Sequence, residues 1–176
     1  MGSIRQAEPP APQLMWHRRF GLRLLMAAPL FALPCAAAVD ERESLRDLDG
    51  VKVVVEDVPH DLSRDRLQKD IESKLKLAGI KVLNSGEFPV GDPYLRVRAS
   101  TTAERAGLVA YNLDLEFAQV VFLRRDPTIT FNRAPTWKAI QRIGLVPQAK
   151  LAESIERDLS EQVDQFIAAF YFVNPK

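Results

Sequence analysis

The longest alternating run in the sequence, residues 108–124, constrains the fold more than any other feature. Apolar side chains occupy one set of alternate positions in its centre: Tyr111, Leu113, Leu115 and Phe117. Polar side chains occupy the other set: Asn112, Asp114 and Glu116. Because successive side chains of a strand point to opposite faces, this run predicts a strand with one buried and one solvent-facing side. Such a strand needs neighbouring strands and an apolar layer to cover it.

The segment before this run predicts a strand, a helix and a second strand. Residues 51–55 (VKVVV) are β-branched around one lysine, which is typical of a strand. Apolar residues recur every three or four positions over 64–78, so we predict an amphipathic helix with Ser63 as its N-cap. Gly79 is expected to end this helix. A short strand at 80–83 then suggests a right-handed βαβ unit.

The remaining chain predicts a meander followed by a long helix. Residues 94–101 alternate, and 128–131 and 136–143 have strand composition on either side of Pro135. A proline in a strand indicates a sheet edge or a bulge. From Lys150 onward, a continuous apolar stripe predicts a second amphipathic helix.

These elements predict an α+β fold with the order β-α-β-β-β-β-α. The sheet is expected to be mostly antiparallel, with both helices packed on one of its faces. Residues 49–176 are enough for one domain with its own core. Residues 39–48 (VDERESLRDL) are charged and are predicted to form a lead-in to that domain.

Residues 1–38 have the features of a cleavable export signal. A basic region is followed by an apolar run at 22–33 and by small residues that a signal peptidase accepts. The basic residues are Arg18, Arg19 and Arg23, and the small residues are Ala36, Ala37 and Ala38. Met15 is an alternative start, because the proline-rich segment before it is unlike the basic region of a signal. The apolar run is shorter than the roughly 18–20 residues of a membrane span, so we predict cleavage and a periplasmic location.

Cleavage changes the charge and excludes some classes of partner. Loss of residues 1–38 removes four of the 24 basic residues and one of the 23 acidic ones, which leaves 20 against 22 and a formal charge of −2. This charge argues against a general binder of nucleic acid or anionic membranes. No transmembrane span is expected after cleavage. The single cysteine, Cys35, leaves with the signal, so the mature domain depends on its core for stability.

The mature chain is poor in catalytic residue types. His60 is its only histidine, and it stands between acidic neighbours, Asp57 and Asp61. A general base or metal ligand is one interpretation of His60; an exposed loop histidine beside a helix start is the favoured one. We find no nucleophile-elbow, phosphate-loop or dinucleotide motif. No cofactor, metal site or catalytic residue is therefore predicted.

The polar face of the sheet offers a candidate interaction surface. Arg96 and Arg98 on one strand are expected to lie beside Asp114 and Glu116 on the next. A charged recognition surface is one interpretation, and a solvated face with cross-strand ion pairs of about 0.2–1 kcal/mol each is the favoured one.

The same face becomes apolar further along the long run, at Ala118, Val120 and Phe122. A partner surface would explain this change, and so would cover by the loop at 84–93, which we favour.

Six stretches of the predicted mature chain carry a family resemblance. They are VKVVVEDV (51–58), LQKDIESKLKLAGIKVL (67–83), PYLRV (93–97), LRRDPTIT (123–130), PTW (135–137) and VDQFIAAFYFVNPK (163–176). Together they resemble a family of small exported proteins of Gram-negative bacteria. The resemblance covers almost the whole mature domain and implies location and fold. It brings no activity, cofactor or catalytic residue.

The sequence therefore predicts a non-enzymatic periplasmic domain that binds a protein or another envelope component through its sheet face or a strand edge. The predicted surface consists of Arg96, Arg98, Asp114, Glu116, Val120 and Phe122. The alternative is a small-ligand binder or hydrolase with a pocket between helix and sheet around His60, formed with Asp57 and Asp61. The sequence does not specify the oligomeric state.

Overall fold

The computed structural model describes residues 40–84, 86–87 and 91–175. Its strands are β1 (Lys52–Val55), β2 (Tyr94–Thr101), β3 (Leu108–Leu123), β4 (Asp126–Lys138) and β5 (Arg142–Pro147). Its helices are α1 (Arg64–Leu77), α2 (Leu151–Val173) and the short 3-10 turns η1 (Glu41–Leu45) and η2 (Gln148–Lys150). The export signal predicted at 1–38, with its alternative start at Met15, lies outside the described residues.

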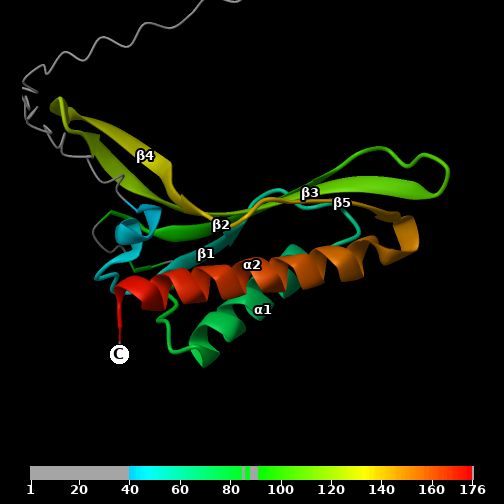
Figure 1. The fold of residues 1–176 in the computed structure, drawn as a ribbon, viewed down its shortest axis with the longest axis horizontal. Helices are drawn as coiled ribbons and strands as arrows, with labels where there is room; N and C mark the ends of the chain where they lie inside the picture. Colours follow the sequence, from blue (N-terminus) through cyan, green and yellow to red (C-terminus); the bar gives the residue numbers. More distant parts are fainter. Residues whose placement is uncertain (1–39, 85, 88–90, 176) are drawn as a thin grey trace, which may run out of the picture. The chain divides into compact units, whose positions relative to one another are not determined.

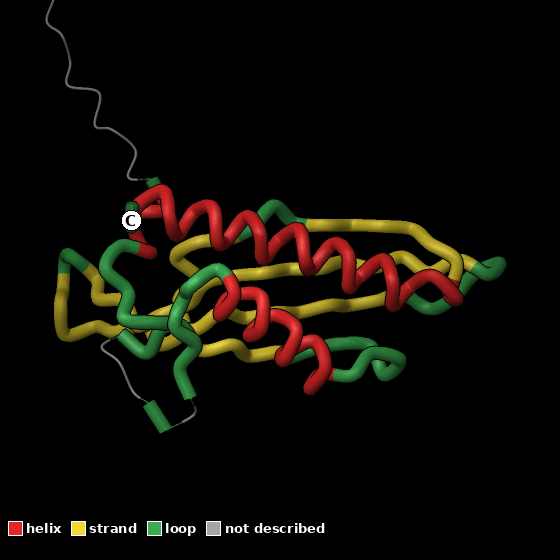
Figure 2. Tube along the Cα trace, turned by 90° about the horizontal axis from the view of Figure 1, so that it is seen from below, coloured by secondary structure: helices red, strands yellow, loops and turns green. Residues whose placement is uncertain are grey.

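The strands form one sheet and the two long helices cover the same face of it (Figure 1). Seen from the helical side, α1 and α2 lie next to each other over the strands (Figure 2). The α+β class, the order β-α-β-β-β-β-α and the mostly antiparallel sheet are confirmed.

The sheet is organised around β3, which is 16 residues long. One edge of β3 pairs with β2, which in turn pairs in parallel with β1. Its other edge is shared: the first part of β3 pairs with β5 and the last part with β4, both antiparallel. This sharing places two different strands along one edge of the sheet.

The core lies between the sheet and the two helices. The apolar positions of β3 predicted to face inward are all buried: Tyr111, Leu113, Leu115 and Phe117. The α2 ring of Phe166 packs against Phe117 at 6.1 Å and against Trp137 at 5.4 Å between centroids. Rings packed edge to face or tilted add stabilisation beyond the apolar area that they bury.

Helix α1 begins and ends as the sequence predicts. The Ser63 hydroxyl oxygen accepts a hydrogen bond from the Arg66 backbone N–H at 3.3 Å. At the other end Gly79 has a φ of 85°, and its N–H donates to the Lys76 carbonyl while the Ile80 N–H donates to that of Leu75. This pair of bonds is a Schellman motif, which favours glycine because of the positive φ.

The prediction of a strand at 80–83 is wrong. Only Val82 pairs here, through an isolated parallel bridge to Val51, the residue before β1. The chain turns away at Asn84, whose backbone N–H donates to the Glu87 carboxylate at 2.7 Å. The parallel partner of β1 is β2, so the β-α-β unit is completed at Tyr94 and not at Ile80.

The strand predicted at 136–143 is also wrong in its bounds. Residues 126–138 form one strand through Pro135, and the chain breaks before β5 starts at Arg142. Two glutamines of α2 satisfy the backbone at the break. The Gln162 side-chain amide donates to the Ile140 carbonyl at 3.0 Å, and the Gln165 side-chain oxygen accepts from the Ile140 N–H at 2.9 Å. With its hydrogen bonds supplied by the helix, Ile140 needs no strand partner.

The segment predicted as a charged lead-in packs on the domain. Leu45 of η1 is fully buried in the core, and its carbonyl accepts a hydrogen bond from the Asn174 side chain at 2.8 Å. The Arg42 guanidinium stacks on the Phe172 ring at 3.7 Å. The aromatic end of α2 therefore packs against this segment.

Candidate functional site

The charged residues predicted on the outer face, the face that lacks helices, do lie side by side. Strands β2 and β3 pair so that Arg96 stands opposite Glu116 and Arg98 opposite Asp114. Inward positions of both strands are buried, and these four residues alternate with them. The cross-strand arrangement inferred from the two alternating patterns is correct.

Glu116 is the centre of this group and is only 3% exposed. Its Oε2 lies 2.5 Å from Nη2 of Arg96, and its Oε1 lies 3.2 Å from Nη2 of Arg98 and 2.6 Å from Nζ of Lys138. One carboxylate is thus bound by cations from β2 and β4, the strands on both sides of β3. The cluster connects three neighbouring strands.

The electrostatics of Glu116 favour its charged form. Burial raises the pKa of this carboxyl, but hydrogen bonds from Lys138 and Arg96 and the charges of Lys138 and Arg98 outweigh burial, so the pKa lies below its ordinary value of 4.5. A carboxylate held this way stabilises the sheet at neutral pH. Because its pKa is lowered, Glu116 is ionised near pH 7 and has no proton to donate there.

The wider outer face is balanced in charge. Its cations are Lys52, Arg96, Arg98, Arg133 and Lys138, and its acids are Glu56, Asp57, Asp92, Asp114 and Glu116. Equal numbers of both signs make a mosaic, not a field of one sign that would attract a phosphate or a metal ion. Among the residues that the structure describes, no group of three or more histidine, cysteine or acidic residues is arranged to hold a metal.

The residues of the alternative site do not share a pocket. Asp57 lines a shallow hollow of about 290 Å³ on the outer face together with Arg98, Ser100 and Asp114. Asp61 accepts a hydrogen bond from the Gln148 side chain at 2.7 Å. His60 is exposed in the turn before α1 and lines none of the described hollows. The favoured interpretation of His60, an exposed loop histidine, agrees with this placement.

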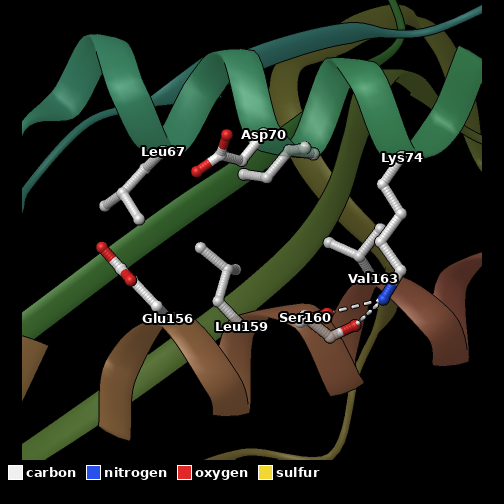
Figure 3. Close-up of a pocket in the computed structure, with 8 residues that line it drawn as sticks. Leu67, Asp70, Lys74, Glu156, Leu159, Ser160 and Val163 are labelled. Carbon is white, nitrogen blue, oxygen red and sulfur yellow. Dashed lines mark hydrogen bonds between the residues drawn. The ribbon is translucent and has the colours of Figure 1, made fainter. Parts of the chain in front are cut away.

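A hollow between α1 and α2 was not anticipated from the sequence (Figure 3). Its floor is apolar, with Leu67, Leu159 and Val163, and the Lys74 ammonium bridges its rim to the Ser160 hydroxyl at 2.7 Å. Its volume is about 60 Å³. Pockets for small ligands usually measure roughly 300–1,000 Å³, so this hollow is a packing seam between the helices.

Strands β3 and β4 continue as a hairpin beyond the C-terminal end of α2 (Figure 2). This hairpin carries exposed apolar side chains. Phe122 is 64% exposed, Ile129 41% and Phe131 49%. Phe131 pairs with Val121 and Phe122 with Thr130, so Ile129 and Phe131 lie on one face of the hairpin and Phe122 lies on the other. We call these three residues, on the two faces of the hairpin, the hairpin patch. Phe122 belongs to the surface predicted from the sequence; Ile129 and Phe131 do not, because nothing in the sequence shows that their strand extends past the helices.

Val120, the other apolar residue of the predicted surface, is half-buried. Its backbone N–H donates to the Gly91 carbonyl at 2.7 Å, so the segment before β2 reaches β3 at this point. At Val120 the backbone at Gly91, near the end of the predicted covering loop, therefore contacts β3. This contact does not extend to Phe122.

Comparisons with protein-family models and with curated proteins found no match. Among solved structures, the crystal structure of a minor lipoprotein from Acinetobacter baumannii is similar to this chain at 17% identity, with a TM-score of 0.33. The match covers 69% of this chain and 95% of that one. Within the described residues, no helix has the length and apolar character needed to cross a membrane.

Proposed function

We propose that this chain is an exported periplasmic binding module without enzymatic activity, and that it contacts a partner protein of the cell envelope through the hairpin patch. The export signal predicted at residues 1–38 supports the location. The observation that carries the binding role is the exposure of large apolar side chains on both faces of one projecting hairpin, with Phe122 on one face and Ile129 and Phe131 on the other. Neighbouring large apolar groups on a surface mark interaction sites more often than single ones do, and a partner that grips the hairpin from both sides would contact all three.

The charges around the hairpin patch indicate the kind of partner. Arg124, Arg125 and Arg133 are exposed, and Asp126 is the only acid between residues 120 and 134. Phenylalanine and arginine are both enriched at the centres of protein interfaces. The hairpin therefore suits a protein partner that offers an apolar pocket rimmed by acidic side chains.

Crosslinking in intact cells tests this proposal. A photo-reactive amino acid in place of Phe122 should give one discrete protein adduct, which mass spectrometry identifies. Changing both Arg124 and Arg125 to Glu should abolish the adduct, because an acidic rim would then be repelled. A crosslink to lipid alone would overturn the protein partner in favour of a membrane surface.

Binding measurements with the identified partner complete the test. Phe122→Ser should weaken the affinity at least tenfold, about 1.4 kcal/mol. Leu77 on α1, which is 90% exposed, provides a matched control because Leu77→Ser removes an exposed apolar side chain elsewhere. Equal affinities of the Phe122→Ser and Leu77→Ser variants would contradict the proposal.

A further inference from the structure

Strand β5 has an open edge that nothing described in the structure protects. It pairs with β3 alone, in an unbroken register from Arg142 to Pro147. Within residues 40–84, 86–87 and 91–175, no loop or side chain hydrogen bonds to the backbone groups of its other edge. Proteins usually cover or interrupt such an edge, because its unpaired N–H and C=O groups invite another strand.

The outward side chains beside this edge are apolar. Ile143 is 76% exposed and Leu145 65%. Leu145 and its neighbour Leu108 on β3 line an open hollow of about 540 Å³ with Ala110. An added strand would find its backbone partners on β5 and an apolar surface for every second side chain.

Glycine keeps β5 close to the core at its centre. Gly144 stands opposite Tyr111, and a Cβ at this position would overlap the Tyr111 ring. The Tyr111 hydroxyl donates to Asp158 of α2 at 2.6 Å, which fixes the ring beneath the strand. Strand β5 is therefore packed tightly on the core at its centre, while its outer edge stays open.

We propose that the free edge of β5 binds an extended segment of a partner protein, about six residues long, with apolar side chains at alternate positions. The six residues of β5 extend over roughly 20 Å, which is the length of an extended peptide of six residues. A second copy of this chain is disfavoured, because stable interfaces need about 20–30 residues on each side. Peptide recognition by strand addition needs less surface, since main-chain hydrogen bonds supply the affinity.

The charged residues next to β5 indicate which peptide side chains would fit on the side that faces the helices. Arg142 at the start of the strand is bound to Glu161 of α2 at 2.7 Å, so this pair is neutral. Side chains of the peptide that point toward the helices would meet this pair, and uncharged polar residues suit it best. The recognised segment is thus an alternation of apolar and neutral polar residues.

A heptapeptide display library tests the proposal on the full chain. Peptides selected on the wild type, and counter-selected on a variant with Ile143→Lys and Leu145→Lys, should show apolar residues at alternate positions. The variant should bind the best peptide at least tenfold more weakly, because charges beside a strand edge oppose pairing. Leu77→Lys is the control, and it should bind like the wild type.

A backbone-blocked peptide makes the test independent of any variant. N-methylation of alternate residues in the best peptide removes hydrogen-bond donors without removing side chains, and should weaken binding at least tenfold. Equal binding of the methylated peptide, or selection without alternation, would overturn strand addition. A concentration-dependent dimer that the Ile143→Lys and Leu145→Lys variant abolishes would overturn the peptide as occupant.

This proposal goes beyond the hairpin patch and shares no residue with it. The Ile143→Lys and Leu145→Lys variant should leave the crosslink at Phe122 unchanged. The failure of one proposal can therefore be distinguished from the failure of the other.

Discussion

Strands β4 and β5 occupy the same edge of β3 but meet solvent in different ways. Strand β4 contains Pro127 and Pro135, and its register with β3 shifts three times. The hydroxyl of Ser44 in η1 donates to the Thr136 carbonyl at 3.2 Å and covers part of its edge. Proline, irregular register and cover by another segment are the ways in which native proteins prevent edge-to-edge pairing.

Strand β5 has none of these protections within its six residues, apart from Pro147 at its end. Both strands therefore show apolar side chains to solvent, but only β5 combines them with a regular, open backbone. This difference teaches that exposed apolar residues alone do not define the kind of interface. The hairpin patch suits side-chain contacts, and the β5 edge suits backbone pairing.

The largest expected effect on stability comes from loosening η1, the segment that covers part of the edge of β4. Leu45→Ala empties a fully buried position and should lower the free energy of unfolding by about 3 kcal/mol. Urea unfolding followed by circular dichroism measures the change. Glu41→Ala, at an exposed position of the same turn, should change it by less than about 0.5 kcal/mol. A loss of under 1 kcal/mol for Leu45→Ala would show that η1 does not hold the edge.

A methyl group beneath β5 should have the next largest effect. Gly144→Ala puts a Cβ into the Tyr111 ring, so we expect about 2 kcal/mol of destabilisation from overpacking. Ile143→Ala changes the next residue on the open side and serves as the control, with an expected change below 1 kcal/mol. Similar losses of stability for the two variants in urea unfolding would argue against close packing of Gly144 on the Tyr111 ring.

The ion pair between Glu116 of β3 and Lys138 of β4 can be tested through the pH dependence of stability. Glu116→Gln should lower the free energy of unfolding by about 1–2 kcal/mol at pH 7. This is less than the loss expected for a fully buried ion pair, because Arg98 and Lys138 are partly exposed. Since the pKa of Glu116 is lowered in the fold, its contribution is complete above pH 4.5 and is lost as the pH falls through the lowered pKa. The stabilities of wild type and variant should therefore converge below pH 4.5. A constant difference down to pH 2 would exclude this role.

The smallest expected effect on stability comes from removing Pro135, which protects β4 against pairing with another strand. Pro135→Ala returns an N–H to an exposed edge position and should change the free energy of unfolding by only about 0.5 kcal/mol. Sedimentation velocity should nevertheless detect more self-association at high concentration for the variant than for the wild type. Equal self-association of the two would mean that the register shifts protect this edge without the proline.

The elements could be predicted where one local pattern decides them. The alternation of 108–124 correctly marked β3 and its buried face, and Ser63 and Gly79 marked the ends of α1. These patterns depend on neighbouring residues only, so no knowledge of the fold is needed. The cross-strand group around Glu116 was also within reach, because alternation on two adjacent strands specifies which residues share a face.

The candidate sites were predicted only in part. Phe122 was identified because it breaks the polar face of β3, whereas Ile129 and Phe131 were missed. Their exposure depends on where α2 ends relative to the hairpin, and that distance is set by the packing of the whole layer. The open edge of β5 was missed because the break at Ile140 depends on Gln162 and Gln165 of α2.

The sequence by itself determined the class of fold, the long strand and its buried face, and the two amphipathic helices, because periodicity and helix caps are local properties. Only the tertiary structure decided that β4 and β5 divide one edge of β3, that η1 covers one part and that the other stays open. The physical reason is that a backbone hydrogen bond can be satisfied by any group that packing brings near. Which group does so is a property of the folded chain.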